Sequence, residues 1–160
     1  MEAAKIVLFI VFLRLAAVNA KIYQKCDLAR ELVEKHRFSR TMLSSWICMI
    51  EAESGFNTKS SKPYPPIVGS LPSVHKSFGL FHINSKNYCG IEHVGGKCKV
   101  RCEDMLKDDI TKAAQCAQIV QNTEGFKAWK GWEMKCKPNI SNLPPLNDCF
   151  RTKRSAAIAG

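Results

Sequence analysis

Acidic residues are scarce in this chain and are missing from its middle. The 160 residues include 14 Asp and Glu against 24 Lys and Arg, which gives a formal net charge of +10. Between Glu53 and Glu92, residues 54–91 carry no acidic side chain. This excludes from that stretch a carboxylate acting as nucleophile, base or metal ligand. The basic excess favours polyanionic partners, among them nucleic acid, anionic lipid and the anionic polymers of bacterial walls, without choosing between them.

Other signals that would assign a function are also missing. The chain has no Arg-rich cluster, zinc-type spacing or aromatic RNA-binding motif, so we do not expect a nucleic-acid partner. Cys98 and Cys102 lack a second pair at ligand spacing, so we expect no metal site there. Beyond residue 20, no run is long and apolar enough for a transmembrane segment.

The first 20 residues have the pattern of a cleavable secretory signal. Lys5 precedes an apolar run over 6–13, and small residues follow, with Val18 and Ala20 at the −3 and −1 positions of the cut. The run is shorter than the ~20 residues that cross a bilayer, and Arg14 interrupts it, which argues against an uncleaved anchor helix. We therefore expect a secreted, extracellular protein.

Eight cysteines follow residue 20, at positions 26, 48, 89, 98, 102, 116, 136 and 149. An even number in a secreted chain predicts four disulfides, although the sequence alone leaves the pairing open.

Hydrophobic periodicity predicts helices at both ends of one domain. The second of them begins at an N-cap on Ser39, buries a stripe that includes Trp46, and ends at Gly55. Prolines and glycine break any helix between residues 57 and 85 and suit hairpins and loops. The other expected helices span residues 27–36 and 108–120, with a short one carrying Trp129 and Trp132. Helices around a β segment predict an α+β domain.

Glu53 is the candidate general acid. At 100° per residue it lies near Trp46, at the edge of the apolar stripe, whereas Glu51 points toward solvent. Such a position is typical of a carboxyl group with a raised pKa. On the residues alone, a solvated glutamate in the last turn of the helix is the favoured alternative.

Three segments together resemble the animal c-type (chicken-type) lysozymes. They are "SSWICMIEAESGFNT", then "FGLFHINS", and "CKVRCEDMLKDDITKAAQC" from Cys98 to Cys116. The resemblance covers residues 21–149, and it divides the chain into a signal peptide 1–20, a c-type lysozyme-like domain 21–149 and a basic tail 150–160. It implies a lysozyme-like fold, in which a sugar-binding cleft separates a helical lobe from a small β lobe. The implied disulfides are Cys26–Cys149, Cys48–Cys136, Cys89–Cys102 and Cys98–Cys116.

The resemblance also implies the chemistry of the cleft. Glu53 matches the family's general acid for hydrolysis of the β-1,4 bonds of peptidoglycan, and Trp129 matches the tryptophan that shields this acid and keeps it neutral. The family's nucleophilic Asp corresponds to Ser77, so the second carboxylate is missing. Losing such an electrostatic partner typically costs about 3–4 kcal/mol, or 10²–10³ in rate. We therefore expect weak or absent muramidase activity.

Sugar binding is expected to survive in part. Where the family places an aromatic pair, this chain has Asn87 and Tyr88, so one ring remains. His82 replaces the usual glutamine. Asn84 is kept and, with the backbone near Ala128, can hold an N-acetyl group, although a turn-forming asparagine is an equal alternative.

Neither calcium nor any other cofactor is expected. In the calcium-binding relatives, the lactalbumins, carboxylates follow the position of Cys102, but Lys107, Lys112 and Ala113 occupy three of the five ligand positions here. Two processing motifs remain: an N-glycosylation acceptor at Asn139 and a dibasic-type site at 151–154, whose alternative is a frayed, uncleaved tail.

Three interpretations follow. The first is a monomeric secreted protein that binds bacterial peptidoglycan or other GlcNAc polymers in antibacterial defence and innate immunity, with little or no hydrolysis. The second is an active lysozyme, with Glu53 as acid and a water helped by Ser77 or His75. The third is a non-catalytic adhesion or reproductive protein on the same scaffold.

Overall fold

A computed structural model describes residues 20–64, 74–143 and 145–151. The expected signal peptide up to residue 19, the Pro-rich stretch 65–73 and the tail beyond residue 151 lie outside these residues.

Two helices form the first part of the domain. Helix α2 (Lys25–Glu34) begins two residues before the predicted start, and a 3-10 turn, Arg40–Met42, leads into α3 (Leu43–Ser54). The predicted stop at Gly55 is confirmed: this residue has a φ of 58°, and its N–H donates to the Glu51 carbonyl at 3.1 Å. A left-handed residue in this position ends a helix, and glycine adopts it without strain.

A small antiparallel sheet follows α3. It consists of β1 (Ser61–Tyr64), β2 (His75–Phe78) and β3 (Ile83–Asn84), in the order β1-β2-β3. The register places Ser77, in the central strand, between Lys62 and Asn84. In the turn after β2, Gly79 has a φ of 74°, and a Cβ there would meet the Met105 carbonyl oxygen at 1.9 Å. Only glycine fits this turn, which leads directly to residues 80–82.

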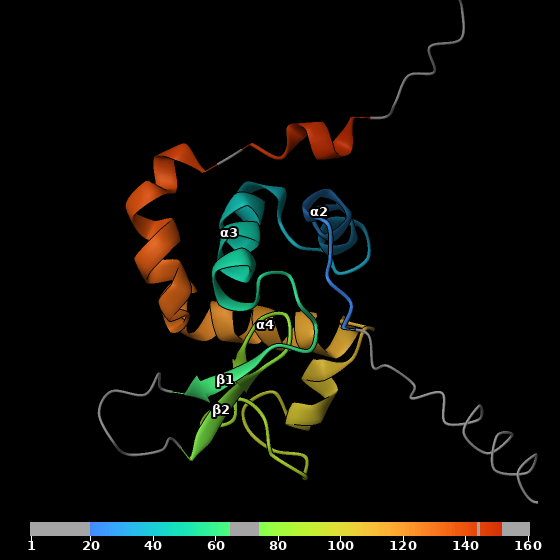
Figure 1. The fold of residues 1–160 in the computed structure, drawn as a ribbon, viewed down its shortest axis with the longest axis vertical. Helices are drawn as coiled ribbons and strands as arrows, with labels where there is room; N and C mark the ends of the chain where they lie inside the picture. The colour runs from blue at the N-terminus through green and yellow to red at the C-terminus, as the bar shows by residue number, and fades with distance from the viewer. Residues whose placement is uncertain (1–19, 65–73, 144, 152–160) are drawn as a thin grey trace, which may run out of the picture.

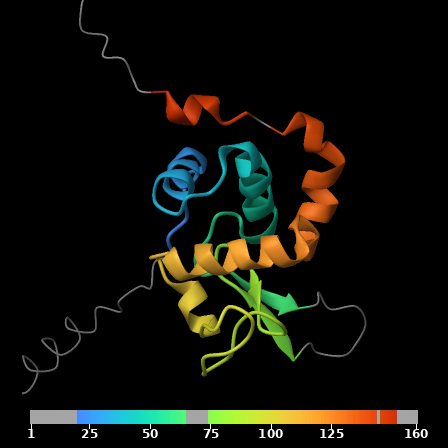
Figure 2. The same cartoon turned by 180° about the vertical axis from the view of Figure 1, so that it is seen from behind.

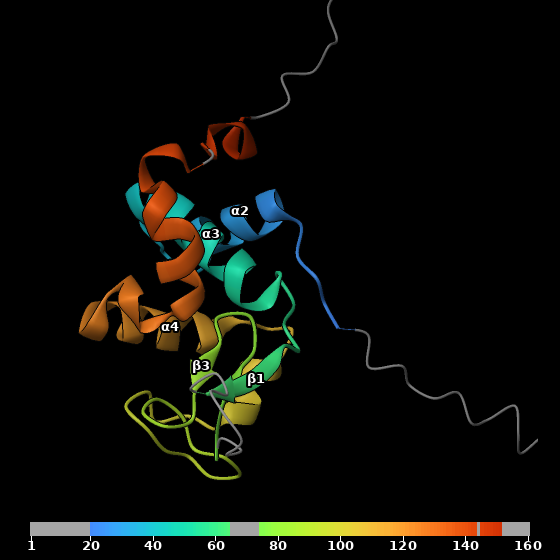
Figure 3. The same ribbon diagram turned by 60° about the vertical axis from the view of Figure 1, so that its left-hand side comes forward.

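Helix α4 (Thr111–Glu124) runs between the sheet and the helices α2 and α3, as Figures 1 and 2 show from opposite sides. It begins later than the predicted start at residue 108, because the Asp109 carboxylate accepts hydrogen bonds from both the N–H and the hydroxyl of Thr111. Four short helical segments follow, Phe126–Ala128, Trp132–Cys136, Lys137–Asn142 and Asn147–Phe150. They pass along α3 and return to α2, and Figure 3 shows this course from the side.

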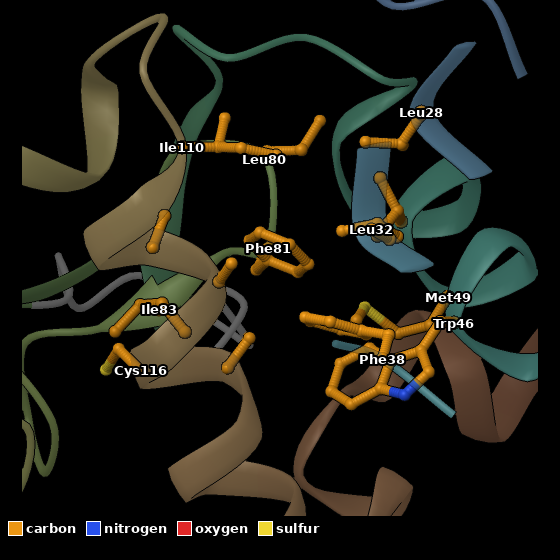
Figure 4. Packing of buried hydrophobic residues seen from close by; sticks show 14 of the residues in the cluster. Leu28, Leu32, Phe38, Trp46, Met49, Leu80, Phe81, Ile83, Ile110 and Cys116 are labelled. Carbon is orange, nitrogen blue, oxygen red and sulfur yellow. The ribbon is translucent and has the colours of Figure 1, made fainter. Parts of the chain in front are cut away.

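One hydrophobic core joins the two parts. Phe81, from the turn between β2 and β3, reaches the aromatic rings of the helical part (Figure 4). The Trp46 ring centroid lies 6.2 Å from that of Phe81, 4.7 Å from Phe38 and 5.6 Å from Trp129. The Trp129 indole N–H donates to the Phe81 carbonyl at 2.6 Å. The sheet is therefore fixed against the helices at the point where the two parts meet.

Four disulfides complete the domain, and all four implied pairings are confirmed. They are Cys26–Cys149, Cys48–Cys136, Cys89–Cys102 and Cys98–Cys116. Across the described ranges, no helix has the length and apolar character needed to span a membrane.

Candidate functional site

A cavity of about 510 Å³ opens where the end of α3, the sheet and the segment after α4 meet. Its lining combines apolar and aromatic surface with a few charged groups. The lining residues are Glu53, Lys62, Pro63, Tyr64, Ser77, His82, Lys127, Ala128, Trp129, Lys130, Glu133 and Met134. A largely apolar cavity with a few convergent polar groups is typical of a ligand-binding site.

Glu53 lies in the last turn of α3, with its side chain 13% exposed. Its Oε1 accepts a hydrogen bond from the Gly131 N–H at 2.6 Å, and its Oε2 lies 3.0 Å from Nδ1 of His82. Lys62 donates to the backbone carbonyl of Glu53. Both carboxylate oxygens therefore have a partner.

These contacts determine the pKa of Glu53. Burial is the largest single cause, and it raises the pKa of Glu53. The hydrogen bonds from His82 and Gly131, together with the charges of His82 and Lys62, lower this pKa by more than burial raises it. The net pKa therefore lies below its ordinary value. The sequence led us to expect a neutral acid shielded by Trp129. The structure differs, because hydrogen bonds that stabilise the carboxylate outweigh the burial.

His82 connects Glu53 to a residue that the sequence analysis missed. The imidazole is almost fully buried, with 2% of its side chain exposed, and its Nε2 lies 2.7 Å from Ser60 Oγ. His82 has a φ of 47°, a strained conformation for a residue other than glycine. Nothing local in the sequence indicates the pair, because Ser60 and His82 are brought together by the turn after β2.

Ser77 lines the cavity, as expected, and its hydroxyl makes one long polar contact. It is buried, and its hydroxyl lies 3.5 Å from the Lys62 carbonyl oxygen, a long contact. Among the described residues that line the cavity, Glu133 is the one acidic residue besides Glu53, and it pairs with Lys130 at 3.4 Å.

The residues predicted to bind sugar fall into two groups. Ala128, Trp129 and His82 line the cavity, whereas Asn84, Asn87 and Tyr88 do not. Asn84 is buried, and its Oδ1 accepts the Asn87 N–H at 2.9 Å, as a turn-forming asparagine does. Tyr88 is completely buried and donates its hydroxyl to Glu124. Burial and that carboxylate raise the pKa of Tyr88.

In addition to Trp129, the cavity lining includes the aromatic residue Tyr64, at the end of β1. The pKa of Tyr64 is raised, first by burial and then by the charges of Glu124 and Glu53. The sequence analysis treated its neighbourhood only as a helix-breaking stretch. The sequence signal that could have indicated Tyr64 is an aromatic residue at the end of a short polar segment, directly before Pro65 and Pro66.

Ion pairs hold the short 3-10 helix Cys102–Leu106. Asp104 accepts a hydrogen bond from Lys112 at 2.7 Å and another from Lys107. These are the two lysines that stand where the lactalbumins have calcium ligands. Two ammonium groups thus neutralise Asp104 within the fold.

The helical part, the small three-stranded sheet, the four disulfides and the cavity beside a buried glutamate together define a lysozyme-like fold. The chain belongs to the C-type lysozyme/alpha-lactalbumin family, whose sequence profile matches residues 21–149. It is 36% identical to a lysozyme of Bombyx mori over 146 residues, which cover 91% of this chain and 98% of the relative. It is 38% identical to a lysozyme of Hyalophora cecropia over 133 residues, covering 82% and 88%.

Solved structures agree with this assignment. A lysozyme from Litopenaeus vannamei matches with a TM-score of 0.66 at 28% identity, over 83% of this chain and all of that one. Canine milk lysozyme matches with a TM-score of 0.58 at 32% identity, over 74% of this chain and 91% of that one.

Proposed function

We propose that this protein is secreted and binds the glycan of bacterial cell walls, or another GlcNAc polymer, in antibacterial defence, with little or no hydrolysis. The observation that carries the proposal is that Ser77 lies in the central strand and lines the cavity; the family resemblance implies that the nucleophile would stand at this position. Secretion is supported by the four disulfides, which persist in oxidising compartments.

Hydrolysis in this family uses a protonated carboxylic acid and an ionised carboxylate on either side of the glycosidic bond. A serine hydroxyl is neutral and does not stabilise an oxocarbenium-like transition state as a carboxylate does. Glu133 does not stand in the place of the missing group, because it lies two residues after Gly131, whose N–H binds Glu53, and not on the strand of Ser77. The cavity therefore keeps the candidate acid, Glu53, and lacks its partner.

The rest of the cavity supports sugar binding. Tyr64, Trp129 and Met134 contribute apolar surface, on which the apolar face of a sugar ring can pack. The backbone at Ala128 and the side chains of the lysines supply polar groups at its edge. Binding of this kind does not need a second carboxylate.

The second candidate is an active lysozyme in which Glu53 acts alone on the leaving oxygen and a water attacks. The observation in its favour is that Glu53 lines the cavity and is partly accessible. An inverting route needs a positioned water rather than a covalent nucleophile, but it also needs a base for that water.

One experiment separates the two candidates. The mature protein is sedimented with insoluble peptidoglycan and with chitin, and soluble fragments are measured in the same tubes. We expect saturable binding, competed by GlcNAc oligomers, without release of fragments. Tyr64→Ala should weaken binding, while the matched control Tyr64→Phe, which keeps the ring, should not. Fragment release at a rate comparable to an ordinary lysozyme, abolished in Glu53→Gln, would establish the second candidate instead.

A further inference from the structure

A chain of hydrogen bonds runs from the loop before β1 to the cavity. Ser60 Oγ lies 2.7 Å from Nε2 of His82, Nδ1 of His82 lies 3.0 Å from Oε2 of Glu53, and Oε1 of Glu53 accepts the Gly131 N–H at 2.6 Å. The participants come from four separate segments of the fold. His82 has a φ of 47°, in the left-handed region.

All of these hydrogen bonds can form with Glu53 as a carboxylate. The Gly131 N–H can only donate, so Oε1 of Glu53 is an acceptor. A ring proton on Nδ1 of His82 is directed at Oε2, and Ser60 Oγ pairs with the other ring nitrogen. Both carboxylate oxygens then accept hydrogen bonds. A proton on Oε2 would instead require Nδ1 of His82 to accept, because the two atoms cannot both donate in one hydrogen bond.

The order Ser60, His82, Glu53 resembles that of an acyl-transfer triad, in which the serine is the nucleophile. The open side of the site argues against that role here. The cavity is lined by Glu53 and His82 but not by Ser60, which lies behind the imidazole. The group that faces a ligand is therefore Glu53, and the other two act through it.

We propose that Ser60 and His82 are positioning residues that hold Glu53 as a carboxylate, so that hydrolysis is blocked at the acid as well as at position 77. This inference rests on the proposed function, because it explains a second reason for weak hydrolysis at the same site. A carboxylate in the place of the family's general acid has no proton to give to a leaving oxygen. The Glu53 carboxylate, held in this way, also presents a fixed hydrogen-bond acceptor to a bound sugar.

Several charged groups besides His82 lie around Glu53. Lys62 of β1 donates to the Glu53 backbone carbonyl and favours the carboxylate. Lys127, Lys130 and Glu133, from the segment after α4, line the same cavity, as does the titratable Tyr64, and Glu133 is paired with Lys130. On the far side of α3, Glu51 pairs with Lys25 of α2 at 3.8 Å. The His82 side chain contacts the Glu53 carboxylate directly.

The first test reads the protonation of Glu53 directly, by carbon-13 NMR titration of glutamate carboxyl groups in the full mature chain. His82→Gln, which installs the family's usual residue, should move the titration of Glu53 to higher pH. Ser60→Ala, which keeps the imidazole and removes only its far partner, should move it in the same direction by less. His93→Gln changes a histidine that bonds the Ile91 carbonyl instead, and it should leave the titration unchanged. An unchanged Glu53 titration in both His82→Gln and Ser60→Ala overturns the inference.

The second test is wall lysis as a function of pH. Ser77→Asp restores a carboxylate at position 77, and we expect it alone to recover lysis only at acidic pH. Adding His82→Gln should raise lysis near neutral pH by about tenfold or more, within the 10²–10⁴ that general acid catalysis supplies, and move the profile to higher pH. Adding His93→Gln should do neither. Equal profiles for Ser77→Asp with and without His82→Gln contradict the inference. Lysis by the unmodified protein would contradict the proposed function but leave the titration to decide the role of His82.

Discussion

The ion pairs of Asp104 lead to a quantitative prediction about stability. The Asp104 side chain is 10% exposed and accepts hydrogen bonds from Lys107 and Lys112. These hydrogen bonds, of which that from Lys107 has the larger effect, lower the pKa of Asp104 from an ordinary 3.8 to about 2. A carboxyl group with a lowered pKa stabilises the fold above its unfolded pKa and loses that contribution as the pH falls through the folded value. The window for Asp104 is therefore from about pH 4 down to about pH 2.

The magnitude follows from the same shift. Each pKa unit corresponds to about 1.4 kcal/mol, and the two lysines are 61% and 55% exposed, so solvent screening reduces the contribution to about 1–2 kcal/mol. Asp104→Asn should lower the free energy of unfolding by this amount near pH 7, and by much less near pH 2.

Urea unfolding of the two proteins at both pH values measures the effect. Asp27→Asn is the control, because Asp27 forms an exposed pair with Arg30 on α2, and it should cost less. Equal stability of Asp104→Asn and the unmodified protein near pH 7, or an equal deficit at both pH values, would refute the reasoning.

Three further predictions concern the frame of the molecule. Reduction of the disulfides should unfold the domain, since bridges over long loops typically contribute about 2–4 kcal/mol each, and peptide mapping should return the four pairings without a free thiol. Added calcium should leave the unfolding temperature unchanged, because the carboxylate of Asp104 already binds the ammonium groups of Lys107 and Lys112. A rise of the unfolding temperature with calcium would contradict this. The intact mass of the secreted chain should show a glycan that Asn139→Gln removes, and a secreted chain of unmodified mass would exclude it.

Local signals in the sequence predicted much of the fold. The stop of α3 depends on Gly55 alone, and the buried face of α3 follows from its apolar spacing around Trp46. The disulfide pairing came from the family resemblance rather than from the spacing of the cysteines. The start of α4 was misplaced, because Asp109 bonds the backbone and hydroxyl of Thr111 before the helix begins.

The site was less predictable, because its contacts join distant segments. Glu53 and Ser77 were found by resemblance, but the environment of Glu53 depends on Gly131 and His82, 78 and 29 residues away. Tyr88 was expected to bind sugar, yet the fold buries it, and its hydroxyl bonds Glu124 of α4. The segments that carry the family resemblance include neither Ser60 nor Tyr64, so the resemblance did not indicate their contribution to the site.

The central claim is that the cavity holds a wall glycan without cutting it. The most direct measurement is native mass spectrometry of the mature protein incubated for many hours with a peptidoglycan-derived oligosaccharide of known mass. We predict a complex with the mass of the protein plus the intact oligosaccharide, lost on Tyr64→Ala. Shortened oligosaccharides that appear with the unmodified protein and disappear with Glu53→Gln would contradict the account.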